Sequence, residues 1–165
     1  MRIGIALGSN LGDRMANLRA ARDAIVDVAA NKSALSSRIY ETDPVNCEPG
    51  AGKFLNAMIE IEYEGDPSEL LEKLIGIEES LGRDRDHAKN VSRKIDLDIL
   101  YADDLIIKNE RLQLPHPRID QRRFVLQPLA DIRPDLILPD RKRPISDLLA
   151  RVQDSTKVSC FAENW

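Results

Sequence analysis

Long hydrophobic runs, aromatic residues and cysteine are all scarce in this sequence of 165 residues. The uninterrupted apolar runs span only a few residues, whereas a membrane-spanning helix needs about 20, so we expect no membrane helix. Aromatic residues make up 4% of the chain, which disfavours the exposed aromatic platform of an RNA-recognition sheet. The cysteines are Cys47 and Cys160, and we expect free thiols and no zinc site.

The signature motifs of several enzyme classes are missing too. The sequence has two histidines, and no Ser-His-Asp arrangement can be argued around them. The glycine-containing stretch GSNLGD at 8–13 has no G-K-[ST] after it, so we interpret it as a tight turn rather than a P-loop. The N-terminal segment turns polar too early for a signal peptide, and we therefore expect a cytoplasmic protein.

The charge balance favours a small anionic ligand over a polymer. The net charge of -4 argues against a general nucleic-acid binder. Basic residues nevertheless gather at 83–94, 116–123 and 140–143. The length of 165 residues suggests one domain spanning 1–165, and with 42% hydrophobic residues the chain can bury a core. We also expect a monomer.

Periodicity predicts a β-α-β-β-α-β order. We expect helices starting at caps Asp13 and Asp66, the second closed by Gly82. A hairpin with Asn109 near its turn is expected at 105–114. The other elements are strands at 2–9, 33–42, 54–64 and 93–104, and short helices or turns at 121–132 and 144–152. This order predicts a ferredoxin-like α+β sandwich, an antiparallel sheet with helices on one face, followed by a C-terminal extension.

The strand at 93–104 carries Asp96 and Asp98 on one face, because strand side chains alternate. A pair of aspartates on a strand can be a solvated outer face. Here the apolar flanking residues suggest a central strand, and a dense basic loop precedes it. Neighbouring carboxylates suit Mg²⁺ held together with substrate phosphates, so the pair predicts phosphoryl-transfer chemistry.

Two further motifs have both a functional and a structural interpretation. His116 stands between prolines in LPHPR, where it is either a fixed ligand or an exposed loop histidine. Arg122 and Phe124 begin a helical segment, either as ligands or as a solvated basic residue and a core aromatic. His87 lies in the polar loop and has no identifiable partner.

The sequence resembles the 6-hydroxymethyl-7,8-dihydropterin pyrophosphokinase family of folate biosynthesis. The resemblance covers nearly the whole chain and rests on ALGSNLGD, YETDPV, FLNA, IEESLGR, SRKIDLDIL, LPHPR and RRFVLQPLADI, in order. It implies a ferredoxin-like fold and transfer of a pyrophosphoryl group from ATP to the pterin's hydroxymethyl oxygen, with release of AMP.

The resemblance also implies roles for individual residues. Asp96 and Asp98 would hold two Mg²⁺ ions with ATP, and Arg83 and Arg93 would be catalytic. The implied ATP contacts are Glu78, Arg83, Arg93, Ile99, His116 and Arg122. The implied pterin contacts are Thr42, Asp43, Val45, Phe54, Asn56 and Phe124.

Three positions depart from the family pattern. Asn90 stands where many members have an aromatic residue, Phe54 where tyrosine is frequent and Asp43 where some members have proline. Two functions remain as alternatives: a non-catalytic ferredoxin-like module that binds RNA or a small regulator, and a kinase that transfers one phosphoryl group and releases ADP.

Overall fold

The computed structural model describes residues 1–45, 49–82 and 92–165. The expectations for Cys47, Arg83, His87 and Asn90 therefore fall outside the described residues. Cys160, which is described, is a free and exposed thiol, as expected. None of the helices in the described ranges has the length and apolar character needed to cross a membrane.

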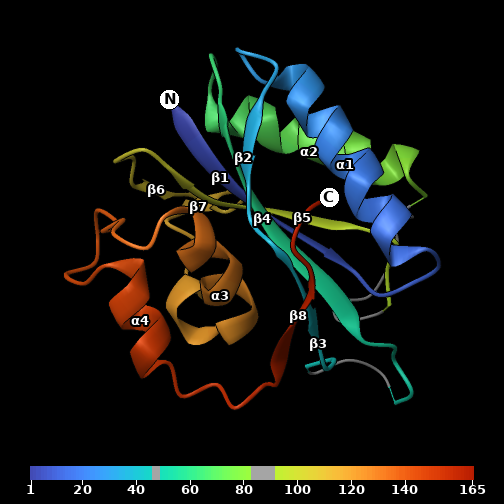
Figure 1. The fold of residues 1–165 in the computed structure, drawn as a ribbon. Coiled ribbons are helices and arrows are strands. Elements are labelled where there is room, and N and C mark those ends of the chain that lie inside the picture. The colour runs from blue at the N-terminus through green and yellow to red at the C-terminus, as the bar shows by residue number, and fades with distance from the viewer. Residues whose placement is uncertain (46–48, 83–91) are drawn as a thin grey trace.

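An antiparallel sheet forms the centre of the structure (Figure 1). Its strand order is β5-β1-β4-β3-β8, and β2 also pairs with β4. The first four strands in that order have the arrangement of a ferredoxin-like sandwich, so the predicted fold is confirmed. The strands are β1 (Arg2–Ser9), β2 (Ala34–Ser36), β3 (Ile39–Thr42), β4 (Phe54–Glu62), β5 (Asp96–Ala102) and β8 (Val158–Ala162).

The two helices of the β-α-β-β-α-β unit begin as predicted, and the second also ends as predicted. Helix α1 (Arg14–Val28) starts where the Asp13 side chain accepts a hydrogen bond from Ala16 N. Helix α2 (Pro67–Ser80) starts where the Asp66 side chain accepts one from Ser68 N. Both aspartates satisfy a backbone donor that has no partner inside its helix. Beyond α2, Gly82 adopts a φ of +93°, a conformation that favours glycine.

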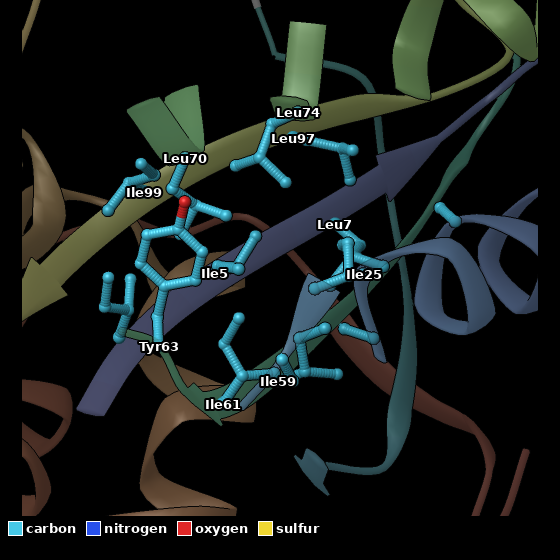
Figure 2. Packing of buried hydrophobic residues seen from close by; sticks show 14 of the residues in the cluster. Ile5, Leu7, Ile25, Ile59, Ile61, Tyr63, Leu70, Leu74, Leu97 and Ile99 are labelled. Carbon is cyan, nitrogen blue, oxygen red and sulfur yellow. The ribbon is translucent and has the colours of Figure 1, made fainter. Parts of the chain in front are cut away.

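Helices α1 and α2 cover one face of the sheet and form the larger core with it (Figure 2). The inward-facing residues of β1 and β4 alternate with residues that point to the opposite face, as the period of two predicts. The labelled members of this core are Ile5, Leu7, Ile25, Ile59, Ile61, Tyr63, Leu70, Leu74, Leu97 and Ile99.

Helices lie on both faces of the sheet, not on one as expected. Helices α3 (Arg123–Ile132) and α4 (Ile145–Arg151) pack on the face opposite α1 and α2 (Figure 1). The apolar residues of this second core come from strands and helices: Met58, Leu100, Tyr101, Leu126, Leu129 and Ile145. The C-terminal extension covers this face because Met58 and its neighbours would otherwise expose apolar surface to water.

Three further expectations need correction. Residues 33–42 form two strands, since the Arg38 backbone N–H donates to Asp131 of α3 instead of to a neighbouring strand. No strand was predicted at β8, whose short sequence VSCFA carries little pattern and which pairs with β3. Strand β5 is not central: it stands at one end of the strand order in the described part. Its flanks are apolar because the sheet is covered on both faces.

The remaining elements connect β5 to α3. A two-stranded hairpin, β6 (Ile107–Lys108) and β7 (Gln113–Leu114), confirms the predicted hairpin. The Asn109 side chain accepts hydrogen bonds from Arg111 N and Leu112 N at its turn. A short 3₁₀ helix (Ile119–Gln121) leads into α3.

Candidate active site

A cleft of about 1670 Å³ opens on the α3 side of the sheet, and Asp96 and Asp98 both line it. Asp96 lies opposite Gly8 of β1, and Asp98 lies opposite Ala6. These small partners leave space above the strands beside the two carboxylates. The register then shifts between Gly4 and Ile5, which leaves Leu100 without a partner in β1. This irregularity has the form of a β-bulge, a feature that often re-aims side chains at functional sites.

Arg93 contacts Asp96 and also the turn at 8–13. Its Nη1 lies 2.8 Å from Asp96 Oδ1. Its backbone N–H donates to Asn10 Oδ1 at 2.8 Å, and Asn10 N donates back to Arg93 O at 3.2 Å. The buried Asn10 side chain also donates to Gly52 O and to Ser92 Oγ. The turn GSNLGD therefore connects the chain before β4 with the chain before β5.

Glu78 and Ile99 take different positions around β5. Glu78 is 5% exposed and reaches from α2 to accept a hydrogen bond from Leu97 N at 2.7 Å. Its side chain lines the cleft. Ile99 is buried in the core between the sheet and α2, and its side chain does not line the cleft.

His116 and Arg122 line the same cleft, near enough to Asp96 for its charge to raise the pKa of both against the larger effect of burial. The His116 backbone N–H donates to the carbonyl of Leu100, the residue at the register shift. Burial, helped by the charges of Arg122 and Arg118, lowers the pKa of His116 to about 4. Its Nδ1 accepts a hydrogen bond from Arg118 N, so the neutral ring carries its proton on Nε2.

Arg122 carries its charge in a half-buried position. Burial is the main cause that lowers the pKa of its guanidinium, and Arg118 lowers it further, while Asp98 and Asp96 raise it. An arginine remains charged nonetheless. The guanidinium carbon lies 5.5 Å from the ring centroid of Phe124, a cation–π arrangement. The two residues thus form one surface of the cleft.

The residues implied for the pterin gather at the β3–β4 end of the same cleft. Asn56 Nδ2 donates to Thr42 Oγ1 at 2.7 Å, and both side chains are buried. Asp43 lies 3.5 Å from Lys53 Nζ, and Val45 is an exposed apolar residue. All the described site residues except Ile99 line the cleft: Thr42, Asp43, Val45, Phe54, Asn56, Glu78, Arg93, Asp96, Asp98, His116, Arg122 and Phe124.

Sequence reasoning missed several residues of this site. Asn10 was interpreted as part of a tight turn, although its carboxamide makes three hydrogen bonds. Arg118 and Asp154 line the cleft, and neither was singled out. For Arg118 a signal was available, since it lies in the LPHPR motif beside His116. Asp154 had no local signal for a role at α3, because Arg123, whose N–H donates to it at the start of that helix, is 31 residues away.

The two carboxylates suit a magnesium ion whose other ligands come from a substrate and from water. Within 1–45, 49–82 and 92–165, no group of three or more His, Cys, Asp or Glu side chains could hold a metal alone. Mg²⁺ is commonly bound by one or two carboxylates together with substrate phosphates and water. Asp96 and Asp98, two acidic side chains on one face of one strand, match that donor set.

Comparison with known proteins shows the family to which this sequence is similar. The family model described as 7,8-dihydro-6-hydroxymethylpterin-pyrophosphokinase (HPPK) matches residues 4–134. A 2-amino-4-hydroxy-6-hydroxymethyldihydropteridine pyrophosphokinase of Bacillus subtilis is 48% identical over 128 residues, covering 78% of this chain and 75% of that protein. The protein of the same name from Pseudomonas aeruginosa is 37% identical over 149 residues, covering 90% of each.

Solved structures show the same fold. Plasmodium falciparum HPPK-DHPS, in a structure with pterin and p-hydroxybenzoate, superposes with a TM-score of 0.71 at 16% identity. The match covers 91% of this chain and 41% of that one. The family model covers most of the chain, and the relatives cover it at identities well above 30%, so the chain belongs to the HPPK family.

Proposed function

We propose that this protein transfers a pyrophosphoryl group from ATP to the hydroxymethyl oxygen of 6-hydroxymethyl-7,8-dihydropterin, in folate biosynthesis. One observation carries the proposal: a single cleft holds two neighbouring carboxylates and several arginines. The same cleft also holds the Asn56 amide and the rings of Phe54 and Phe124. Family membership supports the same reaction. We further propose that the chain acts as a cytoplasmic monomer of one domain, 1–165, without nucleic-acid or membrane partners.

The basic residues that line the cleft would bind the triphosphate of ATP. Arg93 and Arg122 can neutralise phosphate oxygens, and arginine suits this task because its planar fork binds two oxygens at once. The Nε2–H of neutral His116 can donate a further hydrogen bond. Glu78 holds β5 through Leu97 N and borders the nucleotide end of the cleft. We keep the backbone near Ile99 as a proposed nucleotide contact, and Arg83 as a catalytic residue outside the described ranges.

The other end would bind the pterin. Asn56 is held by Thr42 and can present its carboxamide to the edge of a pterin ring. Phe124, with Arg122 over its face, offers a stacking surface. Phe54, Asp43 and Val45 complete this end. The hydroxymethyl oxygen would then point toward the phosphates bound along β5.

In the reaction, the hydroxymethyl oxygen attacks the β-phosphorus of ATP. The bond from that phosphorus to the oxygen bridging it to the α-phosphate breaks, AMP leaves, and the hydroxyl proton is released to solvent. Mg²⁺ bound by Asp96 and Asp98 would supply neutralisation of the negative charge on the phosphates. The arginines orient the phosphates, and positioning of this kind accounts for much of phosphoryl-transfer catalysis.

Separation of the nucleotide products tests the proposal. The purified protein is incubated with ATP, Mg²⁺ and the hydroxymethyl pterin, and the nucleotides are separated by chromatography. We expect AMP and the pterin diphosphate in equal amounts, with each depending on the pterin. ADP as the main product would instead assign an ordinary kinase, and absence of both products would leave a binding module as the alternative.

A further inference from the structure

Helix α3 begins at the cleft wall with a cap that comes from far along the chain. Arg122, the residue at its N-cap position, makes no capping hydrogen bond with its side chain. The first helical N–H, that of Arg123, instead donates to Asp154 Oδ2 at 2.8 Å. A carboxylate at this position satisfies a backbone donor and opposes the positive end of the helix dipole.

Asp154 is itself held in place by several contacts. Its Oδ1 accepts hydrogen bonds from both the backbone N–H and the hydroxyl of Thr156. The Arg123 side chain donates from Nε to the Asp154 carbonyl at 3.1 Å and from Nη2 to the Val152 carbonyl at 3.4 Å. Burial raises the pKa of Asp154, but hydrogen bonds from Thr156 and Arg123 lower it by more, so the pKa lies below its ordinary value.

The segment that carries Asp154 connects the start of α3 with strand β3, on which Thr42 lines the cleft. Residues 152–154 line the cleft that Phe124 also lines. Four residues after Asp154, β8 begins at Val158, which pairs with Thr42 of β3. One end of this segment therefore fixes the start of α3, and the other end continues into β8, which lies beside β3 (Figure 1). Strand β3 carries Thr42, at the end of the cleft proposed for the pterin.

We propose that Asp154 is a positioning residue that holds Arg122 and Phe124 in their binding positions by capping α3 from the C-terminal segment. The inference rests on the proposed function for what these two residues bind. Without the cap, the first turn of α3 loses a backbone partner, and the residues next to it sample more conformations. Binding of ATP and of the pterin should weaken together, because Arg122 and Phe124 share one surface.

Four proteins test this role: the unmodified chain, Asp154→Ala, Asp154→Asn and Asp147→Ala. Asp147 is the matched control, since it is a carboxylate of α4 that pairs with Arg143, just before that helix, and with Arg151 at its end. Calorimetry measures the Kd of ATP with Mg²⁺ and the Kd of the pterin. Amide hydrogen exchange is measured at residues 123–126, in the first turn of α3, and the rate of AMP release gives KM and kcat. Asp154→Ala should raise both Kd values about tenfold, raise KM more than it lowers kcat, and speed exchange.

The other variants separate positioning from general destabilisation. Asp154→Asn keeps an oxygen that can accept from Arg123 N and should recover most of the affinity, while Asp147→Ala should bind like the unmodified chain. Equal Kd values for Asp154→Ala and Asp147→Ala would overturn the inference, as would failure of Asp154→Asn to rescue binding. If Asp154→Ala does not fold, Thr156→Val decides: Kd values about threefold higher support the inference, and unchanged values overturn it.

The two proposals fail in different ways. An unmodified chain that binds ATP but releases no AMP contradicts the proposed function, while the Kd and exchange comparisons still decide the role of Asp154. An unmodified chain that releases AMP, with an Asp154→Ala variant of unchanged Kd, contradicts only the role of Asp154.

Discussion

The side chain of Glu78 and the backbone of Leu97 form a buried hydrogen bond, with 2.7 Å between Oε1 and N. Leu97 stands between Asp96 and Asp98 in β5, at one end of the strand order. A side chain from α2 thus holds the backbone from which both carboxylates project.

We expect Glu78→Leu to lower the free energy of unfolding by about 1–3 kcal/mol, because Leu97 N–H loses its acceptor in a buried place. Glu78→Gln retains an acceptor oxygen and should cost less. Urea denaturation measures both, and AMP release should decrease in the same order. Equal losses in the two variants would show that the hydrogen bond to Leu97 is not what matters.

Asn10 provides a second test, since its carboxamide bridges Gly52, Ser92 and Arg93. We expect Asn10→Ala to weaken ATP binding about tenfold, a loss comparable to one or two buried hydrogen bonds, because Arg93 is no longer fixed. Asn17→Ala is the control, as Asn17 donates to Ser9 and Leu11 and not to Arg93. Equal affinities of the two variants, measured by calorimetry, would contradict a role for Asn10 in placing Arg93.

Replacement of either aspartate tests the proposed magnesium site. We expect Asp96→Ala and Asp98→Ala to abolish Mg²⁺-dependent AMP release while thermal unfolding stays cooperative, since neither side chain belongs to the core. Asp104→Ala removes an exposed carboxylate just beyond β5, and this variant should remain active. Full activity of Asp96→Ala or Asp98→Ala would remove that residue from the metal site.

Alanine substitutions at two glycines of β1 test the shape of the cleft and the packing of the core separately. A Cβ on Gly8 would lie 3.3 Å from Asn56 Oδ1 and 3.8 Å from Phe54 Cδ1. A Cβ on Gly4 would lie 2.2 Å from Tyr101 Cε1. We expect Gly8→Ala to raise the KM for the pterin with little change in stability.

Gly4→Ala should instead lower the free energy of unfolding by about 1–3 kcal/mol through overpacking. Pterin KM values and urea midpoints for both variants check this contrast. A Gly8→Ala variant with an unchanged KM for the pterin would place the ring away from Asn56.

The buried Glu60 predicts a dependence of stability on pH. Burial raises the pKa of Glu60, but hydrogen bonds from Arg133 and Tyr101 outweigh it, so the pKa lies below 4.5. Because the folded state holds the proton less tightly than the unfolded state, this stabilisation is fully present above pH 4.5 and is lost as the pH falls through the folded value.

Glu60→Gln should therefore lose stability at pH 7 and flatten the decline in stability below pH 4.5. Urea unfolding at a series of pH values measures the effect. A decline as steep in Glu60→Gln as in the unmodified chain would assign the acid sensitivity to other carboxyl groups.

Local signals in the sequence predicted the β-α-β-β-α-β unit. The caps Asp13 and Asp66, the turn residue Gly82 and the alternation along β4 act over a few residues, so they can be read without tertiary information. The same alternation placed Asp96 and Asp98 on one face. The resemblance to a known family supplied the other candidate residues, and all those described line the cleft except Ile99.

The tertiary structure decided where elements of weak local pattern go and which distant residues meet. Strand β8 exists through its pairing with β3, and the break at Arg38 depends on Asp131, 93 residues away. Asn10 and Asp154 act through partners 83 and 31 residues distant. The sequence alone determined the two helices α1 and α2, the long strands and the pair of carboxylates on β5, because hydrogen-bonded caps and side-chain periodicity are local. Only the folded chain determined the contacts that position this chemistry, because those depend on packing between segments far apart in sequence.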